Sequence, residues 1–83
     1  MGVYSGIAQD NVTINSGTAT LQSLALTGPL ELAAYTVAEL PAAADNTGTL
    51  VYVSNGAAGS PVVAFSDGTN WLRVDTKAAV AAA

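Results

Sequence analysis

The sequence contains no cysteine and no histidine, and these two absences exclude much of protein chemistry. Without them there is no disulfide, no Ser–His or Cys–His catalytic pair, and none of the ligands that zinc prefers. Composition leaves a Ser–Lys or threonine-based site open, but Lys77 lies in a segment that we expect to be a terminal tail. We therefore expect no enzymatic activity, no cofactor and no metal site.

Charge is scarce too. Only 10% of the residues are charged, against about 25% in a typical soluble domain, and the net charge is −4. Arg73 and Lys77 are the only basic residues. Nucleic-acid binding needs a cluster of basic side chains, so we expect no nucleic-acid partner. No apolar run approaches the length of a membrane span, and no basic start precedes an apolar core as in a signal peptide.

The short length is the third constraint. A chain of 83 residues makes one domain and buries only about 60–65% of the surface that it exposes when unfolded. Domains of this size usually gain stability from disulfides, metals or oligomerisation. Without cysteine and histidine, this chain forms no disulfide and lacks the usual metal ligands, which leaves oligomerisation. With 51% hydrophobic residues, we expect association with copies of itself or with a partner.

Three apolar runs dominate the second half of the chain. They are Leu50–Ser54, Val62–Ser66 and Trp71–Asp75, and they are rich in the residue types that favour strands. Asn55-Gly56 and Asp67-Gly68 separate them and are strong turn signals. Connections this short favour antiparallel neighbours, so the pattern predicts a three-stranded meander in an all-β fold.

Both faces of this predicted sheet carry apolar side chains. Trp71, Arg73 and Asp75 alternate with Leu72 and Val74 along the third strand. Because neither face is plainly polar, we expect a second layer and a sandwich-like domain, the layer coming from this chain or from another subunit.

The first half is predicted to hold an N-terminal arm (1–9) followed by a hairpin region (10–34). Val12 and Ile14 alternate with polar residues in a predicted strand over 10–15, and Leu24 and Leu26 do so in a second over 18–27. We thus expect an extended β arm at the N-terminus of a single domain over 10–76.

The remaining segments are less regular. Tyr35-Thr36-Val37 has strong β character and opens the meander region (35–76). Pro41–Thr47 is predicted to be a loop or a single helical turn, because Pro41 biases Leu40 away from the helical region. The alanine-rich tail, 77–83, is too short for a stable isolated helix, so we expect it to fray or to dock on a neighbour.

Three segments carry a resemblance to a known class of proteins. They read YTVAELPAA from Tyr35 to Ala43, VYVSN from Val51 to Asn55, and AFSDGTNWLRV from Ala64 to Val74. They are similar to a module of tail fibres and related virion appendages of tailed phages, over about half of the chain. Leu72 departs from this pattern, which often has a polar or basic residue there. The resemblance implies a structural or attachment role and supplies no catalytic residue.

Such appendages are commonly trimers, so the resemblance implies a homotrimer in a phage particle, made in the host cytoplasm. A fibre usually needs a long shaft, whereas this chain begins at a Met and has room for an arm and one domain. We therefore expect a capsid decoration, cement or head-fibre subunit that binds the major capsid protein. The alternatives are the tip or adaptor of a tail fibre that binds a host glycan and, less favoured, an accessory domain of a lyase or hydrolase.

Ten residues are predicted to lie in the core or in a subunit interface: Val12, Ile14, Leu24, Leu26, Tyr35, Val37, Tyr52, Phe65, Trp71 and Arg73. Aromatic residues among them could instead stack on a sugar ring of a receptor. Arg73 and Asp75 are expected to form a local or an intersubunit ion pair rather than a ligand clamp. The segment from Asp67 to Asn70 is expected to form a turn rather than a calcium site, because EF-hand spacing is absent. The acidic residues are spread along the chain and are interpreted as solvated.

Overall fold

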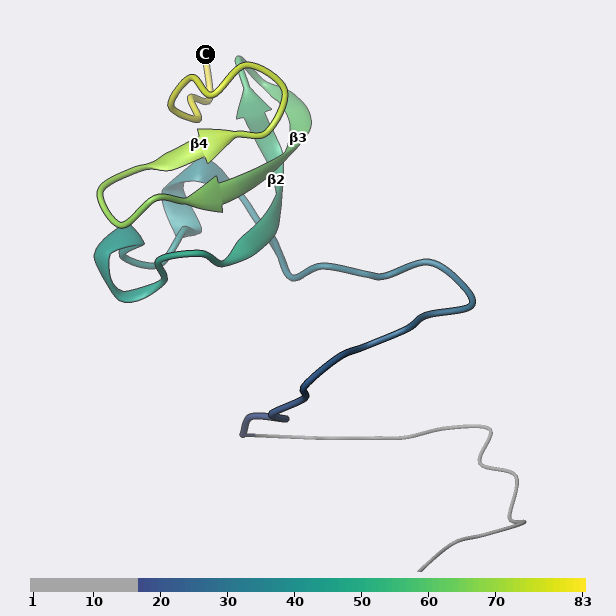
Figure 1. The fold of residues 1–83 in the computed structure, drawn as a ribbon. Coiled ribbons are helices and arrows are strands. Elements are labelled where there is room, and N and C mark those ends of the chain that lie inside the picture. The colour runs from purple at the N-terminus through teal and green to yellow at the C-terminus, as the bar shows by residue number, and fades with distance from the viewer. Residues whose placement is uncertain (1–16) are drawn as a thin grey trace, which may run out of the picture.

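The computed structural model describes residues 17–83, and in this range the chain forms one four-stranded mixed sheet with the order β1-β2-β3-β4 (Figure 1). The strands are β1 (Ala34–Tyr35), β2 (Leu50–Ala57), β3 (Ser60–Ser66) and β4 (Trp71–Arg73). Two single-turn 3-10 helices, η1 (Val37–Glu39) and η2 (Ala43–Asp45), lie between β1 and β2. The expected all-β character is confirmed at this level.

The predicted meander is present as β2, β3 and β4. Val51 pairs with Ala64 and Phe65 pairs with Leu72, both in antiparallel register. The second turn is where the sequence places it. Asp67 Oδ1 accepts hydrogen bonds from the amides of Thr69 and Asn70, at 2.9 and 2.8 Å. Gly68 has a positive φ of 96°, which a residue with a side chain rarely adopts.

The first predicted turn is wrong. Asn55 and Gly56 lie inside β2, and the reversal occurs at Ala58 and Gly59, whose φ angles of 54° and 95° are both positive. The register of β2 against β3 shifts between Val53 and Ala57, which marks a bulge. Asn55 is held in the strand because its side-chain oxygen accepts a hydrogen bond from the Val37 amide at 2.8 Å.

The strand predicted at Tyr35-Thr36-Val37 is shorter and starts earlier. β1 covers Ala34–Tyr35, and Val37 begins η1. β1 runs parallel to β2, with Ala34 opposite Tyr52. The intervening segment, 36–49, is long enough for the dozen or more residues that a parallel connection requires. Its single turn at η2 agrees with the prediction for Pro41–Thr47.

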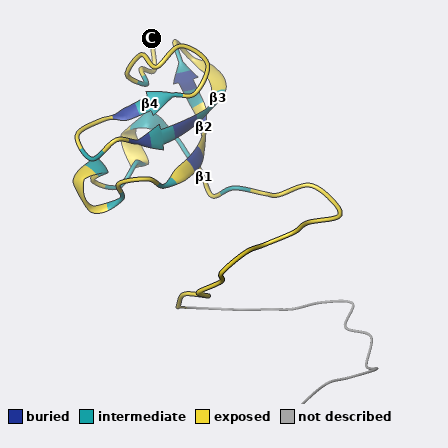
Figure 2. Ribbon diagram, viewed as in Figure 1, coloured by how far each residue is buried: buried dark blue, intermediate teal, exposed yellow. Residues whose placement is uncertain are grey.

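The core lies on one face of the sheet. Val51, Val53, Ala64 and Trp71 are buried there, and Figure 2 shows the buried residues on the strands. Partly buried side chains from η1, η2, the loop between them, β1, β3 and the C-terminal tail pack against this cluster: Tyr35, Val37, Leu40, Ala43, Val62 and Val80. The covering layer is therefore made of 3-10 turns and loops, and not of the second sheet that a sandwich would have.

Buried polar groups in this layer are paired. The Trp71 indole Nε1 donates to the Pro41 carbonyl at 2.8 Å, which joins β4 to the loop between η1 and η2. Ser66 Oγ, at 1% exposure, donates to the Ala43 carbonyl at 2.6 Å and accepts from the Gly68 amide. Such bonds offset the cost of removing polar atoms from water.

The strand predicted over 18–27 is absent from the structure. Residues 17–33 contain no strand, and most of them lead away from the sheet (Figure 1). From here on, this segment is called the arm, and it is distinct from the arm predicted over 1–9. The alternation of leucines with threonine and serine favours a strand locally, but a strand also needs a neighbour to receive its hydrogen bonds. The predicted partner over 10–15, with Val12 and Ile14, and the segment 1–9 lie outside the described residues.

The C-terminal tail docks on its own sheet. The Val80 amide donates to the Trp71 carbonyl at 3.0 Å, and the Arg73 amide donates to the Ala78 carbonyl at 2.8 Å. Near the other end of the sheet, the Ala81 amide donates to the Gly56 carbonyl. The tail thus covers the outer edge of β4. It docks on its own chain, whereas the sequence predicts that it frays or docks on a neighbour. Residues 17–83 hold no helix long and apolar enough to span a bilayer.

Candidate interaction surface

The sheet has a second apolar face, opposite the core. Leu50, Tyr52, Val63, Phe65 and Leu72 share it, because the cross-strand pairs Leu50–Phe65, Tyr52–Val63 and Phe65–Leu72 place their side chains on one side. We call these five residues the open face. Leu50 is 48% exposed and Tyr52 38% exposed, and the other three are half-buried. In the described part of the chain, the residues that pack on the core lie on the other side.

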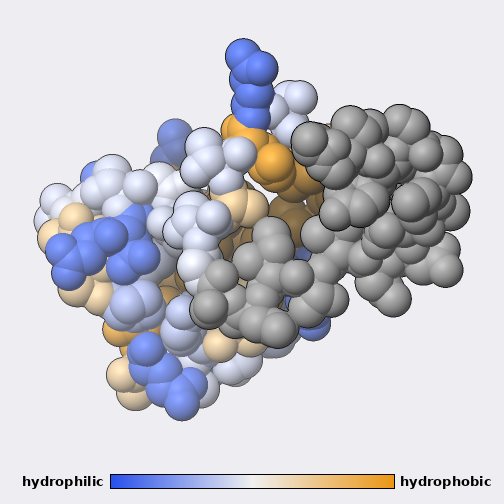
Figure 3. All heavy atoms as spheres, turned by 90° about the horizontal axis from the view of Figure 1, so that it is seen from below, coloured by the Kyte–Doolittle hydropathy of each residue, from blue (hydrophilic) through white to orange (hydrophobic). Residues whose placement is uncertain are grey.

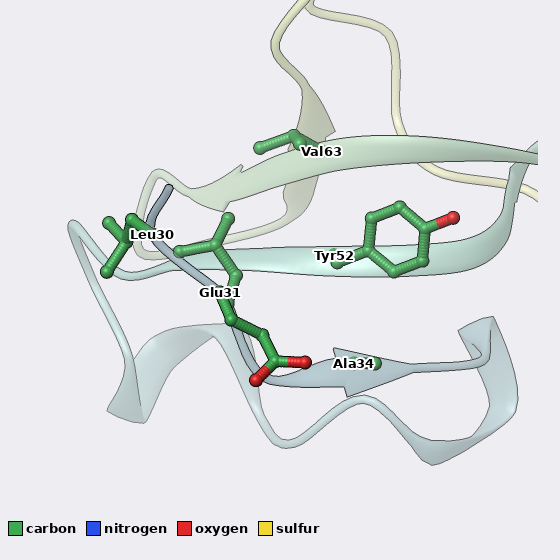
Figure 4. Close-up of a pocket in the computed structure, with 6 residues that line it drawn as sticks. Leu30, Glu31, Ala34, Tyr52 and Val63 are labelled. Carbon is green, nitrogen blue, oxygen red and sulfur yellow. The ribbon is translucent and has the colours of Figure 1, made fainter. Parts of the chain in front are cut away.

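A shallow groove of about 380 Å³ runs along the β1 side of the open face. Tyr52, Val63 and Ala34 line it from the sheet, and Leu30, Glu31 and Leu32 line it from the end of the arm. Figure 4 shows Tyr52 on β2 and Ala34 on the neighbouring strand β1, with Leu30 and Glu31 on the segment that leads into β1. Glu31 brings the one carboxylate to a lining that is otherwise apolar apart from the tyrosine hydroxyl.

The arm carries its own exposed leucines. Leu21, Leu24 and Leu30 are each 61% exposed and Leu26 is 50% exposed. Residues 17–30 include no charged side chain. The space-filling view from below shows hydrophobic residues, in orange, reaching the surface in a group next to the paler body (Figure 3). Single exposed leucines are ordinary, but here four of them fall within residues 21–30, a segment that carries no charge.

The predicted interface residues separate into three groups in the structure. Trp71 is in the core, and Tyr35 and Val37 pack against it. Tyr52 and Phe65 lie on the open face. Leu24 and Leu26 lie on the arm, so they are not core residues, and an interface remains their predicted place. Val12 and Ile14 are outside the described residues.

Arg73 has a fourth kind of environment. It is half-buried at the edge of the core face, opposite Ala64. Its guanidinium binds the Asp75 carboxylate through two hydrogen bonds, at 3.0 and 2.8 Å. The bond to Arg73 lowers the pKa of Asp75, and the same bond raises the pKa of Arg73. The pair is local, which is one of the two arrangements that the sequence predicts.

Sequence reasoning missed Leu50, Val63 and Leu72 as members of a surface. The alternation that places them together is visible in the sequence, and Leu72 is also where the chain departs from the phage pattern. The strand sequences alone do not show which of the two apolar faces the loops cover. That choice depends on contacts such as the bond from Trp71 to Pro41, which joins residues far apart in the sequence.

The described residues bring together no group of three acidic side chains that could hold a metal ion. The Asp67 turn uses its carboxylate on backbone amides, and these bonds lower the pKa of Asp67. The chemistry that the surface offers is therefore apolar contact, with a tyrosine hydroxyl and one carboxylate at its margin. Comparison of the chain with protein-family models, curated proteins and solved structures finds no match to any of the three.

Proposed function

We propose that this chain is a non-enzymatic structural protein of a phage particle, a decoration or head-fibre subunit that binds and reinforces the capsid shell as a homotrimer. The observation that carries the proposal is the exposed apolar side chains of the open face and of the arm. A small domain with exposed apolar side chains and few charges is suited to lie against other protein surfaces.

The phage-like sequence pattern supports the same proposal. Its segments supply most of the folded body: YTVAELPAA runs from β1 through η1 into η2, and AFSDGTNWLRV contains the end of β3 and all of β4. The three characteristic positions of the last segment have structural roles, since Asp67 closes a turn, Gly68 takes a positive φ, and Trp71 fills the core. The pattern is thus a folding signature, which suits a structural module.

Reinforcement would follow from linkage. A subunit that binds neighbouring capsid proteins in the intact shell, and does not bind them when they are apart, adds its binding free energy to the shell alone. The shell then resists heat or osmotic shock without any catalytic step. The major capsid protein is the proposed partner.

Receptor binding is the second candidate, and one observation favours it. Tyr52 lies exposed beside the groove, with Glu31 across from it. An aromatic ring next to a carboxylate can stack on a sugar and accept its hydroxyl hydrogen bonds. Trp71 cannot take this part, because it is 7% exposed and bonded to Pro41.

The test compares particles with and without this protein. We expect the depleted particles to release their genome at a lower temperature and to adsorb to host cells normally. Equal release temperatures with lost adsorption would favour the receptor-binding candidate. Unchanged release and unchanged adsorption would contradict both.

A further inference from the structure

We infer that the arm of one copy docks on the open face of a second copy, so that the trimer is held by exchanged arms. The inference rests on the self-association included in the proposed function but not on the capsid. Two uncovered apolar surfaces of one chain, an extended arm and a flat sheet face, are the observations behind it.

Most of the arm, residues 17–29, does not belong to the folded body in this structure. The described residues have a radius of gyration of 16.2 Å, whereas a compact domain of their number has a radius of about 11 Å. Their long dimension of 51 Å is more than twice either of the others. Leu21, Leu24 and Leu26 therefore stand in water, where each loses the stabilisation that burial of its side chain would provide.

The open face matches the arm in chemistry. The five side chains of the open face are uncharged, and residues 17–30 of the arm are uncharged. A partner of opposite charge would find little to pair with on either surface, since exposed charges are what steer such an encounter. When an uncharged apolar segment binds an uncharged apolar face, no charged group has to be removed from water, so the cost of desolvation is low.

The end of the arm already shows the mode of contact. Leu30 and Leu32 line the groove beside Tyr52 and Val63, on the β1 side of the open face. The rest of the face, toward Phe65 and Leu72, has no such contact with the arm, and the chain bends at Thr27-Gly28. The leucines that precede this bend lie on the part of the arm that leads away from the sheet (Figure 1).

Each contact of this kind joins two different surfaces. Residues 17–29 of one arm would lie on the five residues of the open face of the next copy, so every copy takes part in two contacts, once with its arm and once with its face. Because an arm differs from a face, the contact is of the head-to-tail kind, which closes into a ring when the rotation allows it. A trimer is the smallest ring beyond a pair.

The absence of cysteine makes a direct cross-linking test clean. One tagged population carries Leu24→Cys on the arm, and a second population with a different tag carries Val63→Cys on the open face. After mixing and mild oxidation, we expect a covalent product that contains both tags. Thr69→Cys, an exposed position on the turn before β4, replaces Val63→Cys in the control and should give at least tenfold less product.

Sedimentation supplies the second measurement. The double variant Leu24→Ser with Leu26→Ser should weaken self-association at least tenfold, and its thermal unfolding when diluted should match the parent because neither leucine contacts the body. Ala25→Ser is the control on the same arm and should associate normally.

Three outcomes overturn the inference. The first is equal cross-linking at Val63→Cys and Thr69→Cys. The second is a Leu24–Val63 disulfide that forms only within one chain carrying both cysteines, which would mean that the arm covers its own face. The third is an unchanged trimer in the double leucine variant, which would leave self-association standing and remove the arm from it. Failure of capsid reinforcement with successful cross-linking would affect the proposed function alone.

Discussion

Single residues decide which face of the sheet becomes the core. Trp71 does so through size and through its indole N–H, which reaches the Pro41 carbonyl at 2.8 Å and holds the loop between η1 and η2 over the strands. Ser66 does the same for η2 through Ala43. The residues that set the fold are therefore aromatic or polar anchors that bind backbone carbonyls of distant loops.

Trp71→Ala should lower the free energy of unfolding by about 3–5 kcal/mol, the usual cost of truncating a buried large aromatic side chain. Trp71→Phe should cost less, because it keeps most of the apolar contact and loses the hydrogen bond to Pro41. Denaturant unfolding measures both. Tyr52→Ala is the matched control on the open face, and a Tyr52 variant that lost as much stability as Trp71→Ala would contradict this division of the two faces.

Asp67 gives the protein an acid-sensitive turn. Hydrogen bonds from the amides of Asn70 and Thr69 lower the pKa of Asp67 below its ordinary value of 3.8. On acidification, the unfolded chain binds a proton at this carboxylate before the folded chain does, so the contribution is complete above pH 3.8 and is lost as the pH falls through the folded pKa. Asp75 behaves in the same direction through Arg73.

We therefore expect the stability of the parent to decline below about pH 4, and Asp67→Asn to decline less steeply there. Unfolding midpoints between about pH 2 and 6 measure the two slopes. Parallel slopes for the parent and the variant would mean that the folded and unfolded pKa values of Asp67 are equal. Asp75→Asn, which removes the carboxylate that Arg73 binds, tests the second group in the same way.

At the scale of elements, regular alternation was a sound guide where both partners of a pair are close in the sequence. The strand centres of β2, β3 and β4 and the turn at Asp67-Gly68 follow from local residue types. Asn55 misled, because it is a good turn residue that instead binds the Val37 amide eighteen residues earlier in the chain. The parallel pairing of β1 and the lone arm were also not predictable, since each depends on whether a distant strand is present as a neighbour.

Gly56 shows what the bulge in β2 requires. A Cβ added there would lie 2.9 Å from Val53 Cβ and 3.0 Å from Val62 Cγ1, closer than carbon atoms pack. We expect Gly56→Ala to destabilise the fold by about 1–3 kcal/mol, the usual cost of overpacking. Gly28→Ala is the matched control, because nothing lies within 4 Å of its added Cβ. Equal unfolding midpoints for the two variants would show that the bulge can widen.

The whole molecule combines a small, well-bonded body with an apolar exterior that its own described residues leave uncovered. All side-chain polar atoms buried in the described part have hydrogen-bond partners, so the polar interior is complete. What is incomplete is the cover of the open face and of the arm. The proposed self-association would bury these apolar side chains and so add stability.

Association should respond little to salt. The chain has two basic residues, and Arg73 already binds Asp75. An interface built on apolar contact and backbone hydrogen bonds has few exposed charges for ions to screen, whereas the screening length falls from about 10 to 3 Å between about 0.1 and 1 M salt. Sedimentation over that range should give nearly constant self-association. A fall of tenfold or more would indicate an ionic interface, and so a surface other than the open face.

The parallel pairing of β1 with β2 also orders events in time. The β2–β3 and β3–β4 hairpins close over short turns, but β1 can add to the sheet only after the whole segment 36–49 has closed as a loop, which is slower. In native-state hydrogen exchange, the Tyr52 amide bound to Ala33 should therefore exchange before the Ser66 amide bound to Thr49. Since the arm continues directly from β1, we expect the direction in which it leaves the sheet to be fixed only after the β2–β3 and β3–β4 hairpins have formed.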